Sequence, residues 1–263
     1  MSKKGIRFSY SKLTCFKHCK YEYYLQYILK DEDDYPAEGN YYAEVGSFVH
    51  EILAMIFEGK LKQEDALNYF IDNYDDNVSY KVKQSTMDKT FVLLAEYFEE
   101  IDLDWLKDYS ILGVELEVNF KLAKKNFIGF IDLLLRDKRD GKIVVLDHKS
   151  SDYPFKKNGE VKKASEQNLA TYKRQMYLYC YAVNQIYGEM PKEIIWNHFK
   201  AGGKLARIPF DQNEYDETID WIKGVIKEIS EEEEFDASSD YFYCNNLCPF
   251  RNSCEYLKFG GGE

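Results

Sequence analysis

The sequence contains no continuous apolar run of about 18 residues, which is the length that a transmembrane helix requires. Its N-terminus, MSKKGIRFSYSK, lacks the apolar core of a secretion signal. There is no internal repeat, and no Gly-x4-Gly-Lys-Ser/Thr loop that would indicate an ATP-driven motor. We therefore expect a cytoplasmic protein without a membrane partner and without an ATP motor of its own.

The chain also lacks the excess of basic charge that is typical of broad, non-specific nucleic-acid binders. Its 263 residues include 35 basic and 46 acidic side chains, which gives a formal net charge of −11. Basic residues nevertheless cluster at Lys121–Lys125, Lys156–Lys163 and Lys173–Arg174. A local cleft that contacts backbone phosphates is therefore compatible with the acidic balance of the whole chain.

Hydrophobic periodicity predicts a helical first half and a second half that mixes strands with helices. The apolar spacing changes from helical to alternating near Val114, and alternation is typical of a half-buried strand. The expected elements are helices over 9–30 and 46–59, a helical insertion over about 61–108, strands over 114–120, 127–136 and 142–149, a helix over 166–187, strands over 193–200 and 205–210, and a helix over 212–235. This order predicts an α/β fold with a central mixed sheet flanked by helices.

The second and third predicted strands carry the most informative residues, within FIGFIDLLLRDKRDGKIVVLDHKS. Asp147 and Lys149 alternate on one strand and therefore share a face. Asp140-Gly141 predicts a hairpin between the strands. A two-residue loop would place Asp132 diagonal to Asp147, and a four-residue loop would place the two carboxylates directly opposite each other. Either register groups the three side chains, whereas an odd-length loop or a bulge would separate them.

This grouping has a chemical rationale. Two close carboxylates among apolar residues repel each other, and burial raises their pKa values. A divalent cation such as Mg²⁺ removes this conflict, orients an attacking water and neutralises charge on a scissile phosphate. Lys149 can then hold the water or the phosphate as a mobile point charge. A structural Asp–Lys pair within a sheet is the alternative interpretation of the same residues.

Four segments, in order, resemble the PD-(D/E)XK nuclease superfamily in its RecB-like branch. Gly129-Phe130-Ile131-Asp132 is similar to motif II of this family, and Asp147-His148-Lys149 is similar to its D-x-K motif III. Gly46-Ser47-Phe48-Val49-His50-Glu51 resembles the helical motif I, and Gln175-Met176-Tyr177-Leu178-Tyr179 resembles the Q-x3-Y motif. The resemblance spans residues 46 to 179.

The resemblance implies a restriction-endonuclease-like core over 46–235. The implied metal ligands, for Mg²⁺ or Mn²⁺, are the side chains of His50, Asp132 and Asp147 and the backbone carbonyl of His148. Lys149 would be the catalytic lysine, while Gln175 and Tyr179 would help to place the DNA and the active site; Glu117 is a weaker candidate for an assisting carboxylate.

The implied activity is that of a metal-dependent DNA nuclease, with exonuclease action favoured over endonuclease action. Single strands or free ends would be the substrate, in recombination, repair, or CRISPR or phage processing, with protein partners in recombination or CRISPR adaptation. The alternative is a catalytically inactive nuclease fold that serves as a DNA-binding scaffold.

The cysteines form two groups near the ends of the sequence. Cys244, Cys248 and Cys254 occur in CNNLCPFRNSC, and Cys15 and Cys19 lie near the N-terminus. Clustered thiols in a reducing compartment indicate Zn²⁺ or an iron–sulfur cluster rather than disulfides, and spacing alone does not decide between the two metals.

Similarity to the AddB nuclease domain and to CRISPR-associated RecB-family exonucleases implies a [4Fe–4S] cluster. Its ligands would be Cys19 from an N-terminal arm (1–45) and the three cysteines of a C-terminal tail (236–263). Lys20 replaces the usual proline of this family, and three residues rather than two separate the first two tail cysteines. Zinc, and Cys15 as the fourth ligand, therefore stay open, while Cys180 is expected to be a buried bystander.

Overall fold

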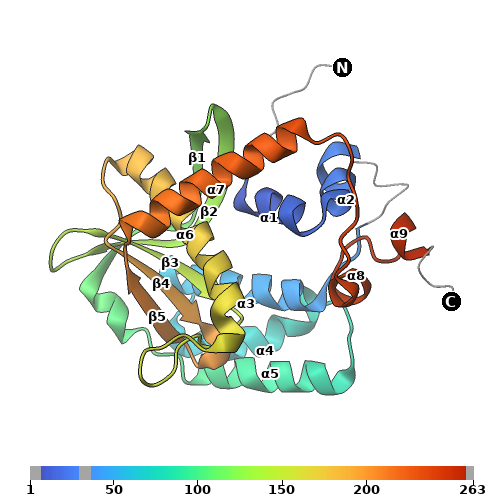
Figure 1. Ribbon diagram of the computed structural model, residues 1–263. Helices are drawn as coiled ribbons and strands as arrows, with labels where there is room; N and C mark the ends of the chain where they lie inside the picture. Colours follow the sequence, from blue (N-terminus) through green and yellow to red (C-terminus); the bar gives the residue numbers. More distant parts are fainter. Residues whose placement is uncertain (1–6, 30–36, 259–263) are drawn as a thin grey trace. The chain divides into compact units, whose positions relative to one another are not determined.

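The computed structural model describes residues 7–29 and 37–258 (Figure 1). The parts of the expected arm and tail at 1–6, 30–36 and 259–263 lie outside this description, and so does the predicted end of the first helix at Lys30. Among the residues that are described, no helix is both long and apolar enough to cross a membrane.

The observed elements follow the predicted order closely, and the α/β fold with a mixed sheet flanked by helices is confirmed. The helices are α1 (Tyr10–His18), α2 (Lys20–Tyr23), a π-helix (Tyr24–Leu29), α3 (Tyr41–Phe57), α4 (Ala66–Asn77), α5 (Gln84–Glu99), α6 (Glu166–Tyr187), α7 (Gln212–Glu231), α8 (Tyr241–Asn246) and α9 (Glu255–Lys258). The strands are β1 (Tyr109–Leu122), β2 (Lys125–Asp137), β3 (Ile143–Lys149), β4 (Glu193–His198) and β5 (Lys204–Pro209).

Three predicted helices differ in extent from the observed ones; the helix expected from Gly46 begins at Tyr41 instead. The first is interrupted at Cys19, which is extended (φ −149°, ψ 110°) and caps α2 by accepting the Glu22 N–H at its sulfur. The last helix ends at Glu231 rather than at Phe235. Four consecutive glutamates begin at Glu231, and negative charge at a helix C-terminus opposes the helix dipole.

The sheet has the order β1-β2-β3-β4-β5. Strand β3 pairs antiparallel with β2 and parallel with β4, and β5 returns antiparallel to β4. The parallel pair requires a crossover connection, and α6 supplies it. Between β1 and β2 the turn residues Ala123 and Lys124 both adopt positive φ (49° and 61°), as a tight two-residue hairpin turn demands.

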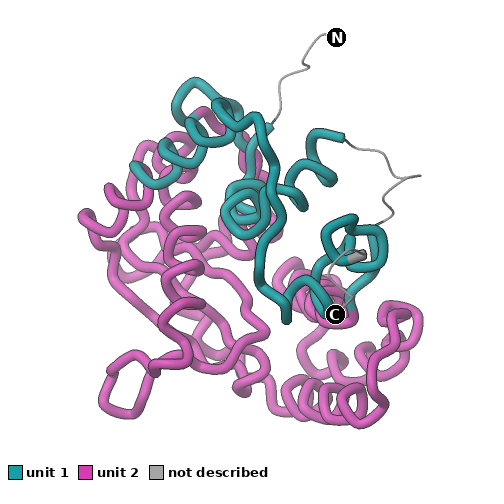
Figure 2. The backbone as a smooth tube through the Cα atoms, turned by 45° about the vertical axis from the view of Figure 1, so that its right-hand side comes forward, with its two compact units in different colours: residues 1–40, 122–127, 220–263 teal, residues 41–121, 128–219 magenta. Residues whose placement is uncertain are grey.

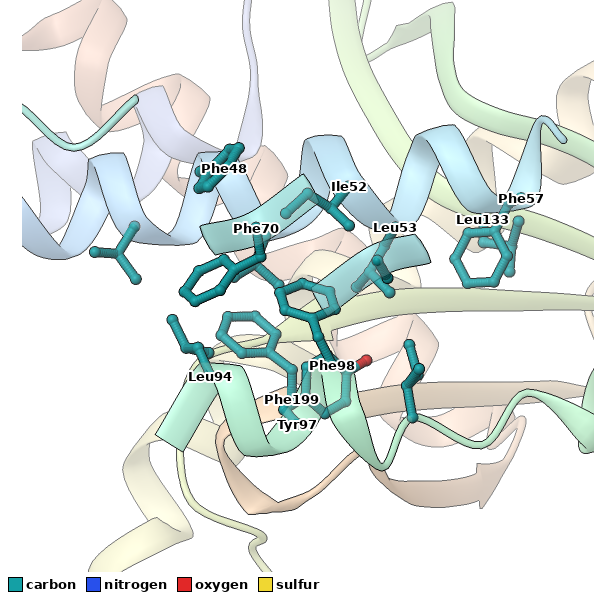
Figure 3. Close-up of a cluster of buried hydrophobic side chains, with 14 of the residues drawn as sticks. Phe48, Ile52, Leu53, Phe57, Phe70, Leu94, Tyr97, Phe98, Leu133 and Phe199 are labelled. Atoms are coloured by element: carbon teal, nitrogen blue, oxygen red, sulfur yellow. The ribbon is translucent and has the colours of Figure 1, made fainter. Parts of the chain in front are cut away.

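Helices α3, α4 and α5 cover one face of the sheet (Figure 1). Their apolar stripes meet alternate residues of the strands, including Leu133 and Leu135 of β2 and Leu146 of β3. Figure 3 shows the aromatic centre of this core, where Phe48 and Phe70 stack with ring centroids 5.8 Å apart. Helix α6 packs against β3. The core thereby fixes the sheet positions from which the polar residues of the next section project.

The chain divides into two compact units (Figure 2). Unit 1 comprises 1–40, 122–127 and 220–263, and unit 2 comprises 41–121 and 128–219. Every candidate active-site residue belongs to unit 2, and the cysteines near both ends of the chain belong to unit 1. The two candidate sites are therefore described separately.

Candidate active site

The loop between β2 and β3 decides how the carboxylates are placed. The strands pair Arg136 with Ile143 and Leu133 with Leu146, and the Asp137 N–H donates to the Lys142 carbonyl at 2.9 Å. Residues 138–141 therefore form the four-residue loop, one of the two registers expected from the sequence. One step beyond the last paired position of this register, Asp132 stands opposite Asp147.

Asp132 is buried at this end of β2, with 8% of its surface exposed. Its Oδ2 accepts the His148 N–H at 2.7 Å and lies 3.5 Å from His50 Nδ1. Burial, reinforced by the charge of Asp147, raises the pKa of Asp132 to about 7. The raised pKa shows that the carboxylate form of Asp132 has too little positive charge around it. A bound cation would supply that charge and stabilise the carboxylate.

His50 of α3 and Glu115 of β1 complete a group with Asp132. One ligand atom from each residue lies within 4.8 Å of the other two, and His50 Nδ1 is 3.8 Å from Glu115 Oε1. Burial opposes protonation of His50, but the nearby carboxylates of Glu115 and Asp132 outweigh it and raise the pKa of His50. Nitrogen and carboxylate oxygen donors of this kind suit a hard divalent cation such as Mg²⁺ or Mn²⁺.

Glu115 is the site residue that the sequence interpretation missed. Its φ of 44° is rare for a residue other than glycine and marks a local distortion of β1. Glu117, which we expected to assist, lies outside the group: it is exposed and accepts a hydrogen bond from Asn119 at 2.7 Å. Both glutamates occupy the polar face of an alternating strand, so only the backbone distortion distinguishes them.

A hollow of about 500 Å³ opens beside this group. His50 and Glu115 line it together with one side of α3, which contributes the small residues Gly46, Ser47 and Ala54. Because these side chains are short, the surface next to the carboxylates is accessible to a large ligand.

Asp147 and Lys149 lie together, as strand alternation predicted. Lys149 Nζ forms an ion pair with Asp147 Oδ2 at 2.6 Å. Asp147 is 2% exposed, and its Oδ2 is buried without a hydrogen-bond partner among the described residues. Unsatisfied buried oxygens are rare because they are unfavourable, so this atom is a good candidate for a metal ligand.

Gln175 and Tyr179, one turn apart on α6, hold the lysine in place. Lys149 donates to Gln175 Oε1 at 2.9 Å, and Gln175 Nε2 donates to the Tyr179 hydroxyl at 3.1 Å. Burial first, and then the charge of Asp147, raises the pKa of Tyr179, so that its phenol stays neutral. A Cβ atom on Gly129 would come within 2.9 Å of the Tyr179 ring, which explains why a glycine occupies this position of β2.

His148 anchors the D-x-K segment from the side of the sheet opposite to Asp147 and Lys149. Its ring stacks on Phe57 with centroids 5.7 Å apart, and its Nδ1 lies 3.0 Å from Asn197 Nδ2. Burial lowers the pKa of His148 well below that of a free histidine, so the ring is neutral. The side chain is therefore structural, which leaves only the backbone carbonyl available for the expected metal contact.

Comparison with known families agrees with this geometry. The family model of the PD-(D/E)XK nuclease superfamily matches residues 7–255. This chain belongs to the PD-(D/E)XK nuclease superfamily. Members of this superfamily act on DNA and use divalent metals, so a DNA substrate and a divalent-metal site follow for this nuclease.

Solved structures also resemble this superfamily member. A protein of Eubacterium rectale described as a "putative exonuclease" is 18% identical, with a TM-score of 0.55 over 98% of this chain and 94% of that one. A protein described as SSO0001 is 12% identical over 97% and 89% of the two chains, and its TM-score of 0.38 is too low for an argument. At these identities the likeness shows the fold alone. No curated protein matched the chain in a separate search.

The second candidate site of this nuclease lies in unit 1, where four cysteines line a cavity of about 80 Å³. They are the four expected ligands, Cys19, Cys244, Cys248 and Cys254. Cys15 does not line the cavity, and its sulfur instead lies 3.9 Å from Gln26 Oε1. Cys180 is fully buried in α6, as expected for a bystander.

Segments from both ends of the sequence enclose this cavity. Leu25 packs with Cys248 and Phe250, and the Ser238 N–H donates to the Cys19 sulfur at 3.3 Å. The Glu38 N–H donates to the Pro249 carbonyl at 2.8 Å, and Arg251 pairs with the Glu38 carboxylate at 2.8 Å. None of the six cysteines, all of which are within the described residues, forms a disulfide.

Proposed function

We propose that this chain is a Mg²⁺- or Mn²⁺-dependent deoxyribonuclease that digests DNA from free ends or in single strands. One observation carries the proposal: Asp132 and Asp147 stand opposite each other on adjoining strands, with Lys149 Nζ 2.6 Å from the buried Oδ2 of Asp147. A sheet gains no stability from such an arrangement by itself, because the two carboxylates repel each other.

His50, Asp132, Asp147 and the carbonyl of His148 would hold the ion, and Glu115 would add a further carboxylate from β1. When bound, the ion supplies charge that stabilises the scissile phosphate and lowers the pKa of an attacking water. Asp132, with its pKa near 7, must lose its proton before it can act as a ligand.

Lys149 would orient the attacking water or the phosphate. An ammonium group has three N–H donors. Gln175 Oε1, Asp147 Oδ2 and the face of the Tyr172 ring surround Lys149 Nζ. Tyr179 fixes the Gln175 amide, so that the Gln175–Tyr179 pair positions the lysine without itself reacting.

The placement in the RecB-like branch rests on His50 and on Gln175 with Tyr179. In this proposal the nuclease works in DNA recombination, in repair, or in CRISPR or phage processing, with protein partners of those systems. Exonuclease action is favoured because the chain has no motor motif and the structurally similar protein is described as an exonuclease.

We further propose that the cavity in unit 1 holds a [4Fe–4S] cluster bound by Cys19 of the N-terminal arm and the three tail cysteines. A tetrahedral zinc ion with Zn–S bonds of about 2.3 Å would bring the sulfurs to within about 3.8 Å of one another. Within the described chain, only His50, Glu115 and Asp132 form a group of three donors within 4.8 Å. The sulfurs instead surround a space, which favours a larger cluster over a single zinc ion.

Cleavage of end-labelled single-stranded DNA with Mg²⁺ or Mn²⁺ tests the nuclease proposal. Asp132→Ala and Lys149→Ala should each lose most activity while remaining folded. If both variants cut as fast as the parent, these residues are not catalytic; if the parent binds DNA but never cuts it, the chain is an inactive scaffold.

An absorbance spectrum of anaerobically purified protein tests the cluster. Broad absorption near about 400 nm with bound iron would support it. A colourless sample containing zinc would favour the alternative metal.

A further inference from the structure

An exposed aromatic ring lies beside the candidate metal ligands. Phe130 is 48% exposed, although β2 is otherwise almost fully buried from Ile131 to Leu135. Single exposed apolar residues are common on proteins, so the exposure of Phe130 gains its meaning only from its position. Phe130 precedes Asp132 by two residues on the same strand.

The geometry of β2 sets the direction of the Phe130 side chain. A side chain built on Gly129 would point at the Tyr179 ring, and Ile131 is completely buried. Phe130 directly follows Gly129 and therefore points away from the Tyr179 ring. Two residues of strand span about 7 Å. The ring accordingly stands about one nucleotide's reach from the carboxylate that would bind the ion at the scissile phosphate.

No interaction within the described residues accounts for this ring. It has no aromatic or cationic partner there, although aromatic pairs are frequent elsewhere in the chain. Tyr172, the other ring near the site, lies 4.6 Å from Lys149 Nζ and is engaged with that ammonium group.

We infer that Phe130 stacks on an unpaired base next to the scissile phosphate and thereby gives the nuclease a preference for single-stranded DNA. The inference rests on the proposed nuclease function and deepens it by naming a residue that determines the substrate. Every base has a π-face, so stacking tolerates any sequence, but a base inside a duplex is already stacked and paired.

Binding of a single-stranded oligonucleotide that carries 2-aminopurine tests this inference. Ca²⁺ would replace Mg²⁺, and a gel after each titration would confirm that the strand is intact. Moving the fluorescent base along the strand should reveal one position where the parent quenches it by stacking. Phe130→Ala should lose this quenching and bind roughly tenfold more weakly, which is the effect of about one stacked base.

Two variants serve as controls. Phe130→Trp keeps a stacking ring and should retain both quenching and affinity. Ile111→Ala removes another exposed apolar side chain, 37% exposed on the neighbouring strand β1, and should bind like the parent.

A strand that lacks the base at the quenched position completes the test. Its affinity for the parent should fall to that of Phe130→Ala, while Phe130→Ala should bind the intact and abasic strands equally. The inference is overturned if Phe130→Ala binds like Ile111→Ala, or if it loses as much affinity as the parent when the base is removed. Either result would leave the nuclease proposal standing, since that proposal is tested separately by cleavage with Asp132→Ala and Lys149→Ala.

Discussion

The two ends of strand β2 each carry a buried aspartate, and their surroundings are opposite. Asp137 is fully buried; Arg139 Nη2 and Lys192 Nζ each contact its Oδ2 at 2.6 Å. The hydrogen bond from Arg139, followed by that from Lys192, holds the pKa of Asp137 well below its usual range. Within the described part of the chain, Asp132 forms an ion pair with His50 alone, and burial raises its pKa to about 7.

This contrast separates a structural carboxylate from a functional one. The chain supplies Asp137 with two permanent cations and so completes its interactions within the protein. The surroundings of Asp132 carry too little positive charge, and Asp147 and Glu115 add negative charge nearby. A bound cation would therefore supply the missing positive charge. Strongly perturbed pKa values in such a setting are typical of active sites.

Replacing each aspartate by alanine should have the largest and most divergent effects. Asp132→Ala removes a proposed metal ligand and should lower the cleavage rate by at least about a thousandfold, equivalent to several kcal/mol. Asp137→Ala should lower the melting temperature by several degrees, because Arg139 and Lys192 lose the carboxylate that pairs with both, yet the folded variant should still cleave. Single-turnover cleavage rates and thermal denaturation curves measure both effects. If both variants lose activity to a similar extent, the distinction between a functional Asp132 and a structural Asp137 is wrong.

The response to pH should also distinguish the two aspartates. The pKa of Asp132 is higher in the folded than in the unfolded chain, so its contribution to stability is complete below about pH 4 and is lost as the pH rises to about 7. The pKa of Asp137 is lower in the folded chain, so its contribution is present at neutral pH and is lost in acid.

A metal ion needs the ionised form of Asp132. The rise in melting temperature caused by Mn²⁺ should therefore be larger at pH 8 than at pH 6. In Asp132→Asn the metal-free protein should be more stable than the parent at pH 8, and the increment from Mn²⁺ should disappear. An increment that is independent of pH in the parent would contradict the assignment of Asp132.

Replacing each of the two glutamates of β1 should also distinguish a metal-binding carboxylate from an exposed one, with a smaller effect. Glu115→Ala should weaken the apparent affinity for Mn²⁺ by about tenfold, since Glu115 lies within the donor group. Glu117→Ala is the matched control, because it removes an exposed carboxylate two residues away on the same strand and should leave metal affinity unchanged. Metal titrations of cleavage activity measure both. Equal effects would show that β1 contributes only general negative charge.

The smallest expected effect concerns the residues that hold Lys149. Gly129→Ala would push the Tyr179 ring and, through Gln175, shift the lysine, with an expected loss of about tenfold in kcat and little change in KM. Gly224→Ala in α7 is the control, because nothing lies within 4 Å of its added Cβ atom. A parent-like kcat for Gly129→Ala would show that Tyr179 does not position the lysine.

Much of the fold could be predicted from the sequence because its periodicities are local. Helix α6 begins and ends where the pattern indicated, and the strands agree to within a few residues at each end. Alternation placed Asp147 beside Lys149, and one of two anticipated loop lengths placed Asp132 opposite Asp147. The break at Cys19 was not predictable, since it depends on a sulfur cap and on a contact with Ser238 far along the chain.

The positions that could not be predicted are those where the backbone departs from regular geometry. The positive φ of Glu115 brings this residue rather than Glu117 to His50, and no composition signal distinguishes the two glutamates. The difference in pKa between Asp132 and Asp137 could not be predicted from the sequence for a related reason. Lys192 reaches Asp137 from the segment before β4, a contact that only the folded sheet creates.

The proposed mechanism requires Asp132 and Asp147 to share one divalent ion. Calorimetric titration of the metal-free protein with Mn²⁺ at pH 8 tests it most directly, with Asp132→Asn and Asp137→Asn measured alongside. We expect one high-affinity Mn²⁺ ion to bind to the parent and to Asp137→Asn, and none to bind to Asp132→Asn. Equal binding of Mn²⁺ by the parent and Asp132→Asn would contradict it.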